Sequence, residues 1–367
     1  MIFVWGNPMY KNIKDAWIYF IVHMLVEIIC FAALARTYQL NLIQSAVIAL
    51  LYDVIAFCPQ FIFGLIHEKY KKLDLGSIGV AMMLIGLILL DYDKYGIRAV
   101  AGIFLIALGN AVIHECGAIL TVIGSEGKLF PSALFVGGGS FGVVIGQTIG
   151  NQGINKWFLL IPLVIIEILI LMTNKGWLYD NESYPVFDII NRSLPVWIVI
   201  VVAFIVTTAR SYLGYAIPIS WKKELWQSFL LFFTMGIGKA FGGWAADRIG
   251  AHKTALITIL GSIPFLIAGE NMMVISIIGV FLFSMTMSIT FGMLLSVMGD
   301  NPGLAFGVTT MALAFGILPT FFVNIGRAAN IAIVIAGSVI CALLMYIALD
   351  KAKSRPAGDP AINDKKQ

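Results

Sequence analysis

Apolar stretches recur along nearly the whole chain, each about as long as the ~20 residues that an α-helix needs to cross a bilayer. Short polar breaks separate them. In lipid, stretches of this length satisfy their backbone polar groups by forming helices. With charged residues, Gly, Pro and Asn taken as boundaries, the pattern predicts twelve transmembrane helices, at 16–35, 42–66, 77–91, 98–122, 129–150, 157–173, 194–219, 224–246, 254–269, 272–298, 303–325 and 330–350.

The composition excludes several other classes of protein. Of the 367 residues, 60% are hydrophobic and only 12% are charged, about half the ~25% typical of soluble domains. No polar segment is long enough for a soluble enzyme domain or a nucleic-acid-binding module, so we expect no nucleic-acid partner and no cofactor. The four cysteines all fall within apolar stretches and form no CxxC pair, so neither disulfides nor a zinc site is predicted.

The longest polar interruption divides six predicted helices from six. We therefore predict an N-terminal six-helix bundle over 1–173, a cytoplasmic linker over 174–193, a C-terminal six-helix bundle over 194–350 and a cytoplasmic tail over 351–367. With both termini in the cytoplasm, the inner segments carry fifteen Lys and Arg residues and the outer loops seven. Because positive residues favour the cytoplasmic side, this orientation is the expected one.

A motif between the eighth and ninth predicted helices points to a family. It runs from Gly243 through Asp247, Arg248 and Gly250 to Lys253, and it resembles the signature loop of the major facilitator superfamily, G-x-x-x-D-R-x-G-x-x-[RK]. Small residues let two helices approach closely, and an aspartate can face the N-terminus of a neighbouring helix. The resemblance implies two pseudo-symmetric six-helix bundles, with this loop as a latch made and broken as the halves move.

A degraded copy of the motif follows the second predicted helix. There Glu68 stands where the aspartate is expected and Lys69 where the arginine is expected, after Gly64, but the second glycine is missing. We include Glu68 and Lys69 in the predicted latch. The alternative interpretation of this segment is an ordinary positively charged cytoplasmic loop.

Three further patches resemble a narrower branch, the bacterial transporters related to fosmidomycin-resistance efflux proteins. They are Leu108–His114 in the fourth predicted helix, Phe135–Gly142 in the fifth, and His23 followed by Glu27 in the first. This resemblance implies a multi-pass protein of the bacterial cytoplasmic (inner) membrane and favours export.

The glycine-rich fifth helix does not predict a nucleotide site. Gly137-x-Gly139-x-x-Gly142 lies inside an apolar stretch with no preceding strand, and the chain has no G-x-x-x-x-G-K-[ST] loop. Small residues instead repeat every four positions, at Gly138, Gly142, Gly146 and Gly150, which predicts close packing against another helix.

Charged and polar residues inside predicted helices are costly in lipid and mark pathways or buried pairs. His23 and Glu27 share one helix face, whereas His114 and Glu115 lie about 100° apart, so at most one of that second pair faces a central pathway. We predict that Arg210 pairs with a first-half carboxylate and so bridges the two halves in one state of the transporter. The predicted substrate and proton pathway comprises His23, Glu27, Asp53, His114, Glu115, Arg210, Tyr212 and Tyr215. The alternative is that each only satisfies a buried partner; Glu167 and Lys239 are assigned to that class.

These features together predict a monomeric secondary transporter that moves a small organic solute by alternating access, coupled to protons and in the direction of export. Uptake of a metabolite is the nearest alternative. A second class is a membrane-embedded enzyme that uses His23, Glu27, His114 and Glu115 as acid–base groups or metal ligands; no H-E-x-x-H spacing supports it, and no metal site is predicted. A third is a non-transporting sensor.

Overall fold

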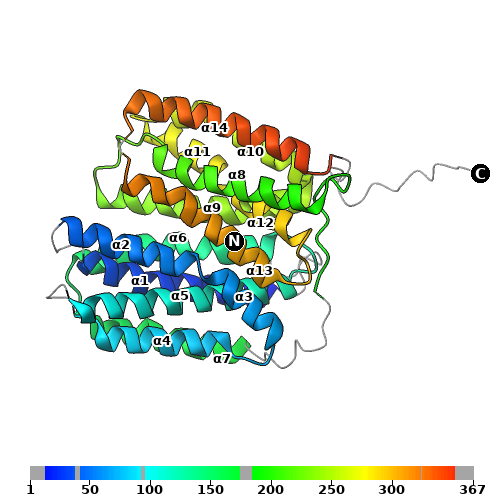
Figure 1. The fold of residues 1–367 in the computed structure, drawn as a ribbon. Coiled ribbons are helices and arrows are strands. Elements are labelled where there is room, and N and C mark those ends of the chain that lie inside the picture. Colours follow the sequence, from blue (N-terminus) through cyan, green and yellow to red (C-terminus); the bar gives the residue numbers. More distant parts are fainter. Residues whose placement is uncertain (1–12, 38–41, 92–95, 174–183, 324, 352–367) are drawn as a thin grey trace, which may run out of the picture.

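The computed structural model describes residues 13–37, 42–91, 96–173, 184–323 and 325–351. Helices account for nearly all of them and form two stacked bundles (Figure 1). The first bundle contains α1 (Ile13–Thr37), α2 (Leu42–Phe57), α3 (Gln60–Lys69), α4 (Leu75–Leu89), α5 (Ile97–Ile123), α6 (Phe130–Asn151), the 3₁₀ turn η1 (Lys156–Leu159) and α7 (Leu160–Thr173).

The second bundle lies above the first in Figure 1. It contains α8 (Val196–Ala216), α9 (Leu225–Ile249), α10 (Ala251–Ala268), α11 (Met273–Ser284), α12 (Met287–Leu295), α13 (Pro302–Ile317), the 3₁₀ turn η3 (Leu318–Phe321) and α14 (Arg327–Ala348). Within the described residues, eleven helical segments are long and apolar enough to cross a membrane, and the shorter apolar helix α4 makes the twelfth. The predicted fold of twelve helices in two six-helix bundles is confirmed.

Two of the predicted spans are broken helices. The second consists of α2 and α3, interrupted at Pro59, which has no backbone N–H with which to continue the helix. The tenth consists of α11 and α12, interrupted at Met285 and Thr286. Each break leaves a carbonyl that a side chain satisfies: the Thr310 hydroxyl donates to Phe57 O at 3.1 Å, and Thr286 donates to Phe283 O at 3.0 Å. Broken helices are tolerated at membrane depth only with such compensation.

The glycine stripe of α6 packs against the backbone of α1. A Cβ atom added at Gly138, Gly142, Gly146 or Gly150 would collide with the carbonyl oxygens of residues 20, 24, 28 and 32 respectively. The spacing of four residues on both helices therefore keeps α1 and α6 in close contact over four turns. The sequence predicted this packing from the repeat alone.

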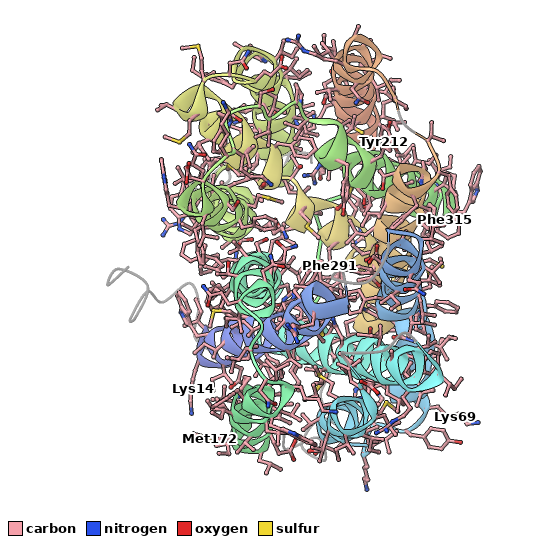
Figure 2. The ribbon with its side chains drawn as sticks, turned by 90° about the vertical axis from the view of Figure 1, so that its left-hand side faces the viewer. Lys14, Lys69, Met172, Tyr212, Phe291 and Phe315 are labelled. Carbon is pink, nitrogen blue, oxygen red and sulfur yellow. The ribbon has the colours of Figure 1, made fainter. Side chains whose placement is uncertain are left out.

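The outer surface is apolar in the way that lipid requires. On α7, for example, Ile161, Val164, Ile168 and Leu171 are each between 52% and 60% exposed. Met172 at the end of the same helix projects from the molecule, as do the side chains on the other outer faces (Figure 2). This surface supports the interpretation of a multi-pass membrane protein.

The described part of the segment between the bundles gathers at one end of the molecule, which we call the linker end. Ile190 forms an antiparallel bridge with Leu349 after α14, and Asn191 N–H donates to Ala348 O at 2.8 Å. Phe187 is 1% exposed. The predicted linker also includes residues 174–183, and the predicted tail residues 352–367; both lie outside the described residues.

Candidate functional site: a buried polar cluster at the seam between two bundles

Two histidines and a glutamate meet inside the first bundle. Glu27 Oε1 lies 3.8 Å from His23 Nε2 and 3.4 Å from His114 Nε2. The two imidazole rings pack edge to face, with centroids 4.2 Å apart. His23 is 8% exposed, Glu27 6% and His114 4%. Residues separated by more than 80 positions in the sequence, on α1 and α5, thus form one buried cluster.

The surroundings of His23 fix which of its nitrogens faces Glu27. His23 Nδ1 lies 2.8 Å from the backbone oxygen of Phe135, which can only accept a hydrogen bond, so Nδ1 carries the proton. Nε2 is then left to face Glu27. A Cβ atom on Gly139 would collide with His23 Nε2, and one on Gly142 would lie 2.6 Å from Glu27 Cβ. The glycines of α6 therefore provide the space in which the cluster is assembled.

A second set of buried polar groups lies next to the cluster on the same helices. Asn110, one turn before His114, donates to the Tyr52 hydroxyl at 2.6 Å and lies 3.4 Å from Cys30 Sγ. Tyr52 and Cys30 are 2% and 0% exposed. This network ties α1, α2 and α5 together and fixes the helix faces that carry Glu27 and His114.

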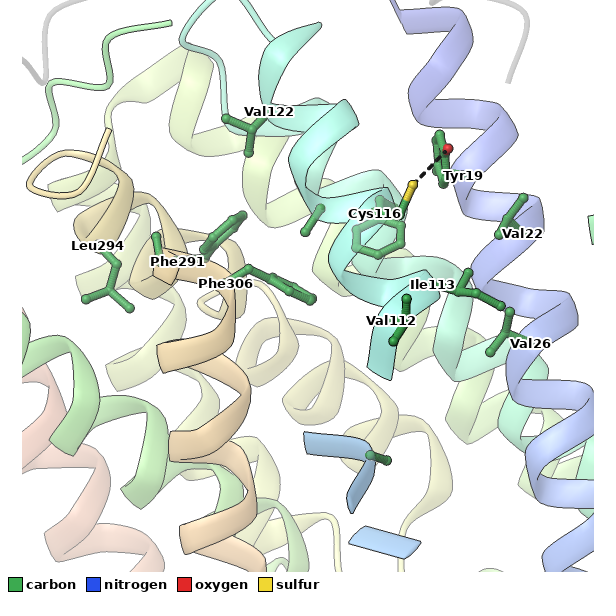
Figure 3. Close-up of a cluster of buried hydrophobic side chains, with 14 of the residues drawn as sticks. Tyr19, Val22, Val26, Val112, Ile113, Cys116, Val122, Phe291, Leu294 and Phe306 are labelled. Atoms are coloured by element: carbon green, nitrogen blue, oxygen red, sulfur yellow. Dashed lines mark hydrogen bonds between the residues drawn. The ribbon is translucent and has the colours of Figure 1, made fainter. Parts of the chain in front are cut away.

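A series of aromatic rings leads from the histidine cluster to the second bundle. The Phe135 ring lies 4.8 Å from the His23 ring and 5.9 Å from that of Phe306 on α13, which in turn lies 5.4 Å from Phe291 on α12. Figure 3 shows Phe291 and Phe306, which pack edge to face, beside apolar residues of α5. Rings from both bundles therefore form one row of aromatic contacts, which we call the aromatic row.

Lys239 brings a positive charge from the second bundle to this region. Its ammonium group donates to Ser140 Oγ on α6 at 2.9 Å, and it is close enough to Glu27 for their charges to interact. The sequence assigns Lys239 to the residues that satisfy a buried partner, and its hydrogen bond to Ser140 is such a contact.

In this conformation Arg210 contacts the second bundle, and the pair predicted for one state of the transporter is not formed. Its guanidinium donates to Phe283 O at 2.5 Å and stacks on the Phe283 ring at 4.7 Å. Within the described residues it forms no ion pair with a first-half carboxylate. The physical reason is the interruption between α11 and α12, which leaves the Phe283 carbonyl free to accept from Arg210.

The remaining pathway candidates are distributed over several places. Asp53 on α2 is close enough to the Tyr215 hydroxyl on α8 to influence it electrostatically across the two bundles, and Tyr215 is 62% exposed. Tyr212 packs beside an apolar cluster of the second bundle (Figure 2). Glu115, which is 0% exposed, faces away from the histidines: a Cβ atom on Gly303 of α13 would collide with its Oε1. The structure therefore brings His23, Glu27 and His114 together but not Glu115 or Tyr212.

The signature loop joins the two bundles at the linker end. The Asp247 carboxylate accepts hydrogen bonds from the backbone N–H of Leu129 at 2.8 Å and of Phe130 at 3.0 Å, at the start of α6. A Cβ atom on Gly243 would collide with Ala133 Cβ. The contact of an aspartate with a neighbouring helix N-terminus is the geometry expected from the motif.

The other motif residues shape the turn that follows α9. Gly250 has a φ of 90°, a region that favours glycine, and ends α9 immediately before α10. Arg248 lies over the Trp244 ring at 5.7 Å, and Lys253 is exposed. These residues thus set the direction of the chain around Asp247 and place positive charge at the linker end.

The degraded copy of the motif makes different contacts. Gly64 packs directly on the backbone of Gly303 and Leu304 at the start of α13, but Glu68 does not cap that helix. Glu68 instead pairs with Lys71 at 3.4 Å and accepts from the Tyr184 hydroxyl at 3.3 Å. Burial and the nearby carboxylate raise the pKa of Tyr184, which keeps its hydroxyl a neutral donor. Lys69 lies over the Tyr70 ring at 5.3 Å, outside these contacts.

Comparison with solved structures identifies the fold. The human organic anion transporter MFSD10 (TETRAN) is 12% identical and superposes with a TM-score of 0.64, covering 93% of this chain and all of its own. The major facilitator transporter FucP, solved in the outward conformation, is 15% identical with a TM-score of 0.57, covering 93% of this chain and 98% of its own. No family model matches the sequence, and neither does any curated protein. The protein has the fold of the major facilitator transporters.

Proposed function

We propose that this protein is a secondary active transporter that moves a small organic solute across a bacterial cytoplasmic membrane by alternating access, coupled to protons. The observation that carries the proposal is the buried cluster of His23, Glu27 and His114 beside the seam between two six-helix bundles. Groups that bind protons are costly in lipid and are retained where an ion or solute passes. The fold, shared with two transporters of low sequence identity, supports the same function.

The seam supplies the elements that alternating access requires. The aromatic row of Phe135, Phe306 and Phe291 and the Asp247 contact both join residues of the two bundles. Such contacts can separate as one bundle tilts against the other. We propose that in this conformation the linker end is closed, and that this end is cytoplasmic, as the distribution of Lys and Arg indicates.

The charges of the second bundle favour a solute with an acidic group. Arg210 lies within α8 and Lys239 within α9, both away from the ends of these described helices. Lys239 also reaches the first bundle, where it donates to Ser140. MFSD10, which has a similar fold, is described as an organic anion transporter. Resemblance to the fosmidomycin-resistance branch favours export, and we propose that direction; uptake of a metabolite is the competing direction.

The experiment is proton flux in proteoliposomes. Purified protein is reconstituted with a pH-sensitive dye inside the vesicles, and fosmidomycin and a panel of other small organic anions are added under an imposed pH gradient. We expect at least one compound to cause dye-reported proton movement, and Glu27→Gln to abolish proton movement while solute exchange continues. Glu126→Gln, at an exposed carboxylate in the α5–α6 turn, is the matched control and should transport normally.

Compound-dependent proton movement that persists unchanged in Glu27→Gln would remove Glu27 from the coupling mechanism. If no compound in the panel causes flux at any gradient, the transporter proposal itself is overturned in favour of the sensor or enzyme class. The direction of solute accumulation under a fixed gradient separates export from uptake.

A further inference from the structure

Three side chains in the first bundle direct metal-binding atoms at one point. One ligand atom from each of His23, Glu27 and His114 lies within 4.8 Å of the other two, and Glu27 Oε1 is 3.8 Å from His23 Nε2 and 3.4 Å from His114 Nε2. A zinc-type ion holds its nitrogen and oxygen ligands at ~2.0–2.2 Å, which places neighbouring ligands of a tetrahedral site roughly 3.5 Å apart. Small side-chain rotations would therefore bring all three atoms to coordination distance of one ion.

The cluster as it stands has unsatisfied atoms. Glu27 Oε2 and His114 Nε2 are buried and have no hydrogen-bond partner among the described residues. Buried polar atoms are nearly always bonded. A cation bound between the carboxylate and the two imidazole nitrogens would give these buried atoms the partner that they lack.

The hydrogen bond from His23 to the Phe135 carbonyl is the arrangement found behind metal-binding histidines. In such sites the ring nitrogen that does not bind the metal donates to a carbonyl or carboxylate, which fixes the tautomer and the ring orientation. Here Nδ1 donates at 2.8 Å, so the lone pair of Nε2 is directed toward Glu27. Gly139 leaves room for that nitrogen, because a Cβ atom would collide with it.

We propose that His23, Glu27 and His114 form a binding site for a first-row divalent transition-metal ion, such as Zn²⁺ or Co²⁺. Two imidazoles and one carboxylate suit these ions, whereas Mg²⁺ and Ca²⁺ prefer oxygen ligands only. Three protein ligands leave a fourth position for water or for an acidic group of a solute. Metal binding is measured on the purified chain and does not depend on the transport proposed above.

The neighbouring charges and aromatic rings define how the site responds to its surroundings. Lys239 faces the site from α9 and opposes a divalent ion, Ser140 holds the Lys239 ammonium, and Phe135 covers the histidine rings from the side of α13. Removing the positive charge of Lys239 should therefore strengthen metal binding, which a merely structural cluster would not show.

The test is Co²⁺ titration of the full chain, purified in detergent and freed of metal, at a pH where free imidazole is neutral. We expect one equivalent of Co²⁺ to bind with the intense visible absorption of a four-coordinate site, and Zn²⁺ to displace it. His114→Gln and Glu27→Gln should each weaken binding more than ~100-fold, beyond the 10- to 100-fold typical of changes behind a ligand. Gly139→Ala, which displaces His23 without removing a ligand, should weaken it less, and Lys239→Met should strengthen it at least ~threefold.

His252→Gln is the matched control, because His252 lies on α10 against the Tyr346 ring, outside the cluster. It should bind Co²⁺ normally, and every variant is required to elute as the same monodisperse species. The proposal is overturned if no stoichiometric binding occurs, if binding is unweakened in His114→Gln, or if binding is lost in His252→Gln. In the first case, proton flux that still depends on Glu27 would show that the cluster binds protons only, so the transport proposal would stand alone.

Discussion

The two places where the bundles cross at the linker end are built on the same plan but are held by different groups. At the first crossing, Gly243 brings α9 against α6, and Asp247 caps α6 with two hydrogen bonds. At the second, Gly64 brings α3 against α13, but α13 is capped by its own Asn301, whose side chain accepts from Leu304 N–H at 2.8 Å. The glycine contact is thus common to both, whereas the carboxylate contact between bundles belongs to the first.

The difference shows which part of the motif is geometric and which is electrostatic. Glycine at the crossing is required by backbone distance, so both copies keep it. The acidic residue contributes a charge at a helix N-terminus, typically about 0.3–1 kcal/mol and up to about 2 kcal/mol when partly buried. At the second crossing Asn301 caps α13, and Glu68 contacts Lys71 and Tyr184 instead. Glu115 lies against the start of α13 from the interior of the first bundle.

The largest expected effect comes from filling the second crossing. Gly64→Ala places a methyl group against the Gly303 and Leu304 backbone, which cannot move as a flexible side chain can. Overpacking costs about 1–3 kcal/mol, so the population open at the linker end should rise roughly 5- to 150-fold. Spin labels at the exposed positions 73 and 253 report this opening as a longer label-to-label distance in double electron–electron resonance spectroscopy. Gly326→Ala, whose Cβ meets open space, is the control.

Breaking the electrostatic part of the first crossing should have the next largest effect. Asp247→Asn keeps the shape of the side chain but removes the charge and one of the two acceptor oxygens. A loss of about 1–2 kcal/mol is expected, which corresponds to roughly 5- to 30-fold more of the open form in the same label measurement. Asp247→Glu should retain part of the closed population. An unchanged distance distribution in Asp247→Asn would show that Gly243 alone holds this crossing.

The third prediction concerns which acidic residue, Glu115 or Glu68, stabilises the second crossing. Glu115→Ala removes a fully buried side chain that lies against the first turn of α13, and about a 5-fold increase in the open form is expected from the lost packing. Glu68→Ala removes a partly exposed side chain from the same region. Equal effects of the two variants would contradict the assignment of Glu115 to this crossing.

The smallest effect is expected from the ion pair at the second crossing. The Glu68 and Lys71 side chains are 38% and 29% exposed, so solvent screens their attraction, and such pairs contribute about 0–1 kcal/mol. Glu68→Gln removes the charge paired with Lys71 but keeps an oxygen that can accept from Tyr184, so it should change the open population by less than roughly fivefold. Tyr184→Phe, which loses the 3.3 Å hydrogen bond, should have an effect of similar small size. A tenfold effect of either variant would place Glu68 on a par with Asp247.

The fold was largely predictable because the hydropathy of a whole membrane-spanning helix can be read from about twenty consecutive residues. Twelve apolar stretches, the division into two halves and the α1–α6 glycine stripe all follow from spacing along the chain. The interruption at Pro59 was not predicted, since a proline inside an apolar stretch is compatible with both a kink and a break. The interruption at Thr286 has no proline at all, and it depends on Arg210 and Thr286 satisfying one carbonyl, which no local pattern encodes.

The site was predictable in its members but not in its grouping. Intramembrane charge selected His23, Glu27 and His114, and the 100° separation of His114 and Glu115 correctly implied that they face different partners. That His114 would meet Glu27 depends on how α1 and α5 pack, which a single sequence does not specify. The same limit explains why the sequence does not specify Ser140 as the partner of Lys239 or Phe283 as the partner of Arg210 in this conformation.

All three members of the histidine cluster belong to the first bundle, and α6, which supports them, is held to α1 over four turns. If one bundle rotates as a body against the other, distances within the cluster stay constant while Lys239, Phe306 and Phe291 move relative to it. The affinity of the cluster for a cation would then be altered by changing the field and the solvent around it rather than by rearranging its ligands. A site of this kind releases its ion because an external charge approaches, without any cost of deforming the coordination sphere.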